Sequence, residues 1–99
     1  MPAVARFGDP TTTGHACDGV TTVVGGSSNV FCNGKRVERK GDPTAPHTIL
    51  AGVICVPHSA VINVGSSTVF VNGIPCARVG DSTDGGAIIG GSSNVFAGG

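Results

Sequence analysis

Three histidines carry the metal-binding chemistry that this sequence offers, and none of them falls in a predicted strand. His15 and His47 follow an aspartate at similar distances, so they hold nearly equivalent places in two related segments. Cys55 and His58 form a Cys-x-x-His step, at which one short turn can direct a thiolate and an imidazole to the same tetrahedral ion. Three imidazoles and one thiolate predict a closed zinc site, structural rather than catalytic, because no coordination position stays open for water.

The fourth ligand of this site has alternatives. Cys55 is the favoured one, Cys17 is a second choice because it also lies in a loop, and Asp84 or a water molecule remains possible. Cys32 and Cys76 align with strand valines in related segments and are interpreted as buried small hydrophobes. The even number of cysteines does not by itself predict a disulfide, because a reducing cytosol keeps thiols free.

A hydrolytic zinc, held by three histidines and a bound water, is the alternative to a structural one and would need a general base. Asp9, Asp42 and Asp81 are explained as repeated turn residues, and Glu38 is predicted in a strand away from the loops. Cys55 and His58 could form a nucleophile pair, but no third residue is placed to orient it. The sequence therefore predicts that the protein is not an enzyme.

An internal repeat organises the chain around these residues. Its first half reads SSNVFCNG at 27–34, SSTVFVNG at 66–73 and SSNVFAG at 92–98, and its second half ends in Gly-Asp at residues 9, 42 and 81. Asn-Gly flanked by β-branched or aromatic residues predicts a tight hairpin. The sequence thus predicts three strand-turn-strand units, permuted at the termini, whose variable loops (10–26, 43–65 and 82–91) carry the site.

Composition supports an all-β fold in one domain spanning residues 1–99. The chain holds 17 Gly and 6 Pro among its 99 residues, which disfavours helices. Only four of its residues are Phe, and there is no Trp or Tyr, so the core must be thin and a metal or a partner is expected to support it. The repeats begin and end with the sequence, which predicts no effector extension.

Charge and hydropathy exclude several partners. The formal net charge is zero with 12% charged residues, so nucleic acid binding through phosphate neutralisation is not expected. The basic segment 35–40 is interpreted as a solvated strand and turn. No apolar run is long enough for a membrane span, and residues 1–6 do not resemble a signal peptide, which predicts synthesis in the cytoplasm.

The stretches PAVARFGD (2–9) and PCARVGD (75–81), together with the repeated Ser-Ser-Asn-Val-Phe strands, resemble the PAAR-repeat family, named for its Pro-Ala-Ala-Arg motif. The resemblance implies a small conical domain with pseudo-threefold symmetry that caps and sharpens a trimeric β-helical spike, of the VgrG type in type VI secretion or of contractile phage tails. It also implies one zinc ion near the tip. Carried over by position, His15, His47 and His58 match loop ligands, and Cys55 or Cys17 completes the set. The third loop has no Cys or His, so the second loop must supply two ligands.

The function expected from this resemblance is membrane piercing and effector delivery. One such protein would sit on each spike trimer, touch a membrane only while piercing it, carry separately bound effectors, and leave the cell at the spike tip or form part of a phage tail. Phe31, Phe70 and Phe96 recur once per unit and are interpreted either as core or as a face toward the spike. A free-standing zinc-binding module or a zinc hydrolase is the alternative function.

Overall fold

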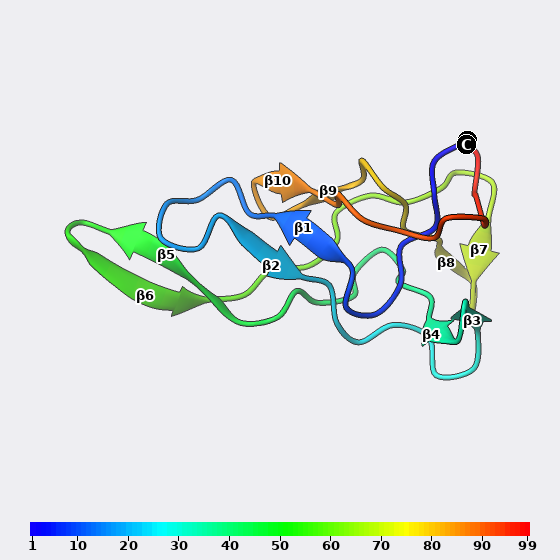
Figure 1. Cartoon of the computed structure of the whole chain (residues 1–99), viewed down its shortest axis with the longest axis horizontal. Helices are drawn as coiled ribbons and strands as arrows, with labels where there is room; N and C mark the ends of the chain where they lie inside the picture. Colours follow the sequence, from blue (N-terminus) through cyan, green and yellow to red (C-terminus); the bar gives the residue numbers. More distant parts are fainter.

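The computed structural model describes all residues from 1 to 99 as an elongated all-β molecule with extents of 42 × 23 × 23 Å. Five small antiparallel hairpins account for its regular structure, and no helix capable of crossing a membrane is present (Figure 1). The strands are β1 (Pro10–Thr12), β2 (Val20–Thr22), β3 (Phe31–Cys32), β4 (Lys35–Arg36), β5 (His47–Ala51), β6 (Ile54–His58), β7 (Phe70–Val71), β8 (Ile74–Pro75), β9 (Ser82–Thr83) and β10 (Gly86–Ala87).

Two short hairpins, β3–β4 and β7–β8, lie at the end of the molecule that we call the base, which also holds the C-terminus (Figure 1). Asn33 and Gly34 join the first pair of strands with φ of 54° and 76°, and Asn72 and Gly73 join the second with 55° and 76°. Two successive positive φ angles define the type I′ turn that fits the twist of paired strands. The predicted Asn-Gly hairpins are therefore confirmed.

An Arg-x-Gly-Asp turn occurs three times in the chain, once near the N-terminus and once after each of these two hairpins. In the turn at Arg39, the Asp42 amide donates to the Arg39 carbonyl at 3.0 Å, and Gly41 holds φ at 90°. The Asp42 carboxylate accepts bonds from the Arg39 guanidinium in the two-pronged arrangement typical of strong Arg–carboxylate pairs. The same turn and the same ion pair recur at Arg6 with Asp9 and at Arg78 with Asp81. The predicted turn role of these three aspartates is thus confirmed, and each also neutralises an arginine.

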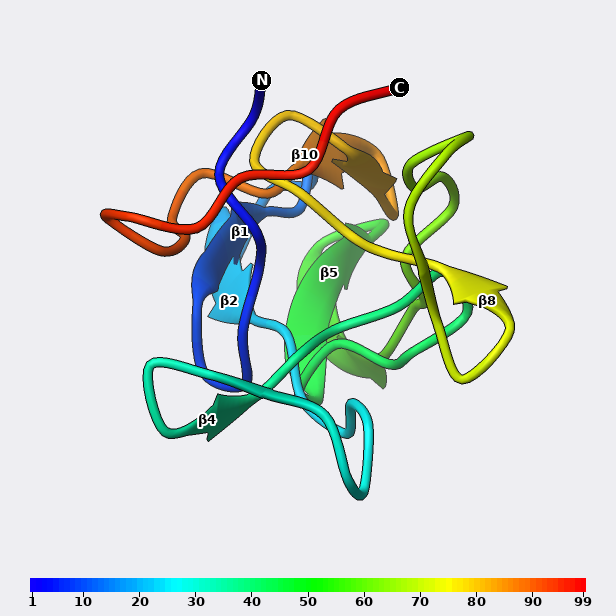
Figure 2. The ribbon, with the colours of Figure 1, turned by 90° about the vertical axis from the view of Figure 1, so that its right-hand side faces the viewer.

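Three segments of the chain, all outside the named strands, meet in a closed ring of backbone hydrogen bonds. The Ala5 amide donates to the Ala77 carbonyl, the Ala77 amide to the backbone carbonyl of Glu38, and the Glu38 amide to the Ala5 carbonyl, each at 3.0 Å. Viewed from the base, β4, β8 and the two chain ends lie toward the periphery, around the long axis of the molecule (Figure 2). Each of the three segments therefore makes the same contact with the next one.

The apolar core is small and divided into two clusters. One cluster contains Val4, Cys32, Val37, Val71, Cys76 and Ala97, and the other contains Ala5, Val23, Ile62, Ala77 and Ile88. Cys32 and Cys76 are free and buried in the first cluster, as predicted. With so few large side chains inside, the chain depends on hydrogen bonds and on connections between its loops.

The structure corrects two details of the predicted organisation. The three variable loops are themselves hairpins, β1–β2, β5–β6 and β9–β10. Each of these hairpins contains threonine, a β-branched residue that favours strands. In the segment 35–40, Lys35, Arg36 and Lys40 are exposed as expected, but Glu38 is completely buried. The backbone ring at Ala5 and Ala77 carries Glu38 inward, and neither of its carboxylate oxygens has a hydrogen-bond partner.

Candidate metal centre

His47 and His58 face each other at the open end of the β5–β6 hairpin. His47 is the first residue of β5, His58 is the last residue of β6, and the two are directly paired in the register of the hairpin. Directly opposed residues of an antiparallel pair point to the same face. Their ring centroids lie 5.0 Å apart with the planes nearly perpendicular. The hairpin therefore presents two imidazoles on one side.

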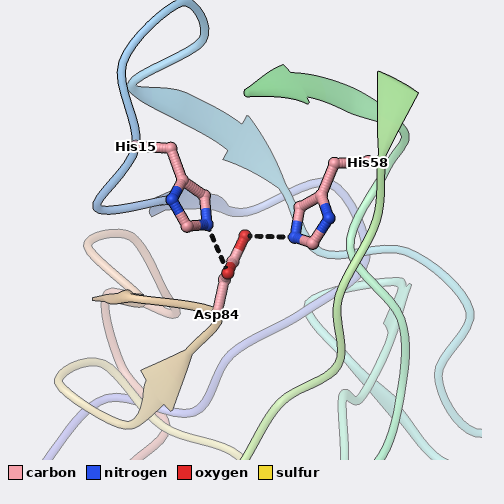
Figure 3. A group of neighbouring side chains, drawn as sticks. All are labelled: His15, His58 and Asp84. Atoms are coloured by element: carbon pink, nitrogen blue, oxygen red, sulfur yellow. Dashed lines mark hydrogen bonds and ion pairs between the residues drawn. The ribbon is translucent and has the colours of Figure 1, made fainter. Parts of the chain in front are cut away.

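The other two hairpins bring one residue each to the same place. His15 lies in the connection between β1 and β2, where its amide donates to the Thr13 hydroxyl at 3.1 Å. Asp84 lies in the turn between β9 and β10 with a φ of 51°, a left-handed conformation that aspartate tolerates better than most residues. Three separate hairpins thus converge on one point, as predicted for the variable loops (Figure 3).

The three imidazoles surround the Asp84 carboxylate. His15 Nε2 lies 2.6 Å from Oδ1, His47 Nε2 lies 3.0 Å from Oδ2, and His58 Nε2 lies 3.1 Å from Oδ2. The His47 side chain is only 2% exposed and that of Asp84 11%, whereas those of His15 and His58 are about one-third exposed. Solvent therefore reaches the cluster mainly at His15 and His58.

The carboxyl group of Asp84 is held in its charged form by this environment. Partial burial by itself raises the pKa of Asp84. The hydrogen bonds from His15 and His47, together with the charges of His15 and His58, lower this pKa by more than burial raises it. The net effect is a pKa below the ordinary value of an aspartate. A buried carboxylate among nitrogen atoms is consequently available as a negatively charged ligand.

The second nitrogen of His47 fixes the orientation of its ring. His47 Nδ1 lies 3.0 Å from the Ala45 carbonyl, which can only accept, so Nδ1 carries a hydrogen. In the neutral ring, Nε2 then keeps its lone pair and directs it at an oxygen of Asp84. Two lone pairs at this distance repel unless a proton or a metal cation lies between them. A backbone carbonyl holding the distal nitrogen is also the usual arrangement behind a metal-ligating histidine.

The donor set fits a zinc ion. One ligand atom each from His15, His58 and Asp84 lies within 4.8 Å of the others, so this group could hold a metal ion. Zinc binds histidine nitrogen and carboxylate oxygen at about 2.0 to 2.2 Å, which places tetrahedral ligand atoms roughly 3.3 Å apart. The His47 nitrogen, close to Asp84 Oδ2, is available as a further donor.

The predicted cysteine ligands do not join this cluster. Cys17 and Cys55 form a disulfide with a Cα–Cα distance of 6.1 Å, so neither offers the thiolate that the sequence interpretation required. The physical reason is that residues 54–58 form a strand rather than a short turn. Side chains three residues apart in a strand point to opposite faces, so Cys55 is directed away from the side on which His58 lies. Residues Cys17 and Ile49 form an isolated bridge that brings the β1–β2 connection alongside β5.

Asp84 was identified from sequence only as a lesser alternative. The third loop contains neither Cys nor His, and this made a ligand from it appear improbable. The available signal was the repeat itself, because Asp84 follows the Asp81 turn as His47 follows Asp42 and His15 follows Asp9. Each of the three hairpins after a Gly-Asp turn therefore contributes at least one side chain to the cluster.

Comparison with protein families supports the sequence resemblance. Residues 48–89 match the family model of the PAAR motif, and this segment includes His58, Asp84 and the Arg78–Asp81 turn. No curated protein matches the chain. The segment 48–89 therefore carries a PAAR motif, which is typical of the spike-tip proteins of type VI secretion systems and phage tails.

Proposed function

We propose that this protein caps the blunt end of a trimeric β-helical spike of the VgrG or phage type, with one structural zinc ion behind its tip. In this role it sharpens the spike for membrane piercing, leaves the cell at the spike tip, and carries any effector as a separately bound protein. The proposal combines the PAAR motif with two features of the structure, which are the repeated base and the cluster around Asp84.

The observation that carries the proposal is the ring formed by Ala5, Glu38 and Ala77. Three equal hydrogen bonds around one centre support a pseudo-threefold arrangement of this single chain. A trimer presents the same surface three times around its own axis, and a monomer can match it only if its surface repeats in the same way. The ring supplies this repetition without requiring three copies of the protein.

The base also offers apolar contacts in a repeated pattern. Phe31, Phe70 and Phe96 occur once per repeat and are each about half exposed, and each follows a partly exposed valine. Exposed apolar groups that recur in this way on a small protein are typical of an interaction surface. The spike would cover them, with its terminal strands pairing to the hairpin edges.

The zinc ion would be held by His15, His47, His58 and Asp84. When bound, zinc supplies a fixed tetrahedral link between three hairpins that are otherwise connected by few apolar contacts. Asp84 fills the position that a catalytic zinc would leave to water, which favours the structural role over a hydrolase. Binding energy of the metal then stabilises the folded arrangement of the loops.

The test is assembly with a trimeric VgrG-type spike, measured by native mass spectrometry. The expected species contains one chain per spike trimer and one zinc. Phe70→Asp should weaken the complex at least about tenfold, because a buried charge at an interface core is costly. Val53→Asp is the matched control, since Val53 is 96% exposed in the β5–β6 turn at the opposite end. Failure to bind any β-helical spike would exclude this function, and a free-standing zinc module or hydrolase would take its place.

A further inference from the structure

A pocket of about 370 Å³ opens beside the β3–β4 hairpin, well away from the histidine cluster. Its lining consists of two aromatic rings, two cations and a glycine, namely Phe7, Phe31, Gly34, Lys35 and Arg36. Both rings are about half exposed, so their apolar faces are accessible to a ligand. The pocket therefore combines an apolar floor with a cationic rim.

The cations of this rim lack partners within the molecule. Three of the six basic residues, Arg6, Arg39 and Arg78, are held by the aspartates of their turns. The side chains of the remaining three, which are Lys35, Arg36 and Lys40, make no hydrogen bond or ion pair. All the lysine and arginine side chains without a partner thus lie in residues 35–40 of a chain whose formal net charge is zero.

The repeat shows that this pocket exists at one of three equivalent junctions only. The Phe7 amide donates to the Arg36 carbonyl at 2.8 Å. At the second junction the backbone amide of Lys40 donates to the Pro75 carbonyl, and at the third the Val79 amide donates to the Ala3 carbonyl. At the second junction Lys40, Ile74 and Pro75 stand in place of Phe7, Lys35 and Arg36, so two aromatic rings and two cations occur together at the first junction only. A threefold partner would meet three different surfaces here, so the pocket suits a ligand that binds once per chain.

We propose that this pocket binds an acidic peptide segment of a separate protein, through one aromatic or large apolar side chain flanked by carboxylates. The rings of Phe7 and Phe31 can pack against an aromatic group, and the volume suits one or two side chains. Lys35 and the planar guanidinium of Arg36 can bind the flanking carboxylates, with Arg36 able to do so through two hydrogen bonds.

Charge favours a peptide over a nucleic acid. Binding to a nucleic acid relies on many phosphate contacts, and each needs a cation along an extended track. This protein offers only two cations at the pocket, Lys35 and Arg36. Such a short positive surface is complementary to two or three carboxylates close together in a single peptide.

The test is a nuclear magnetic resonance titration of the zinc-loaded, isotope-labelled protein with a capped pentapeptide, in which one tryptophan is flanked on each side by two acidic residues. Saturable shifts are expected at the amides of Gly34, Lys35 and Arg36. Arg36→Glu should weaken binding about tenfold or more, because it removes the charge-assisted hydrogen bonds to the carboxylates of the peptide and adds a negative charge that repels them.

Lys40→Glu is the matched control, because it makes the same charge change at the second junction, outside the lining of the pocket. It should alter the affinity by no more than about twofold, consistent with screened charges at an exposed position. Replacing the tryptophan of the peptide by alanine should abolish saturation. The proposal is overturned if no saturable shift occurs, if Lys40→Glu weakens binding as much as Arg36→Glu, or if an oligothymidylate of equal charge binds more tightly than the peptide. The titration uses the chain without a spike, so its outcomes do not depend on the proposed function; because Phe31 belongs to both surfaces, the peptide and the spike are expected to compete for it.

Discussion

The Nε2 atom of His47 lies 3.0 Å from Oδ2 of Asp84, and both side chains are almost entirely buried. Because the opposite nitrogen of the ring is held by a backbone carbonyl, this pair is oriented before any ligand arrives. The two residues belong to different hairpins, β5–β6 and β9–β10. A cation placed between them would therefore join two parts of the chain that are distant in sequence.

The first prediction concerns the role of Asp84 in metal binding. Asp84→Asn should lower zinc affinity at least about tenfold, because it removes the negative ligand while keeping the size of the side chain. Zinc content of the folded protein is measured by elemental analysis, and affinity by competition with a chelating dye. Asp18→Asn is the control, since Asp18 is an exposed acid that accepts bonds from Thr48 near the same end. Full zinc content in Asp84→Asn, together with its loss in Cys55→Ser, would assign the site to a sulfur ligand instead.

The sequence predicted the arrangement of the histidines better than it predicted the fourth donor. Repetition placed His15, His47 and His58 in loops of one repeated scaffold, and such loops meet because the scaffold closes on itself. The behaviour of Cys55 could not be predicted in this way. It depends on whether residues 54–58 form a turn or a strand, and their register is fixed only by pairing with β5.

The burial of Glu38 was missed for a related reason. Its neighbours in sequence are charged, which is typical of a solvated segment, but the position is equivalent to Ala5 and Ala77 in the repeat. Equivalence in the ring outweighs local polarity, because the backbone hydrogen bonds of the ring decide which way the residue points. Aligning the repeats by structure rather than by polarity identifies Glu38 as the exception among three ring residues.

The second prediction is a pH dependence of stability that originates at Glu38. Burial raises the pKa of Glu38 from 4.5 to about 8, and the nearby charge of Asp42 adds to this effect. A raised carboxyl pKa means that the folded protein binds the proton more tightly than the unfolded chain. Stability from this group is complete below pH 4.5 and is lost progressively as the pH rises to about 8, by a total on the order of a few kcal/mol.

Glu38→Gln should remove this slope, and Glu38→Ala should be more stable than the wild type at pH 8. Urea unfolding of the zinc-loaded protein between pH 5 and about 9 measures both effects, and the difference between wild type and variant cancels the contribution of the histidines. Asp18→Asn should leave the slope across this interval unchanged, because the pKa of Asp18 is lowered, chiefly by its hydrogen bonds from Thr48. An identical slope in wild type and Glu38→Gln would contradict the prediction.

The third prediction concerns the disulfide between Cys17 and Cys55. It closes a sequence separation of 38 residues, for which restriction of the unfolded chain predicts a stabilisation of about 3 to 4 kcal/mol. The double variant Cys17→Ser/Cys55→Ser should therefore unfold at lower urea concentration than the oxidised wild type and should match the reduced wild type. Reductant should have no effect on the double variant, because Cys32 and Cys76 are free thiols. Retention of one zinc per chain in this variant is also expected.

The fourth prediction isolates the backbone demand of the repeated turns. Gly41 has a φ of 90°, and a Cβ atom added there would meet no other atom within 4 Å, so only backbone strain opposes a side chain. Gly41→Ala should therefore destabilise the protein by about 1 to 2 kcal/mol. Gly19 is also unobstructed but has no positive φ, so Gly19→Ala should be neutral or stabilising by up to about 1 kcal/mol, through restriction of the unfolded chain. Urea midpoints of the two variants measure this contrast. Equal destabilisation of the two variants would contradict this prediction, because the positive φ of Gly41 would then not account for the cost, and the turn at Arg39 would not require glycine.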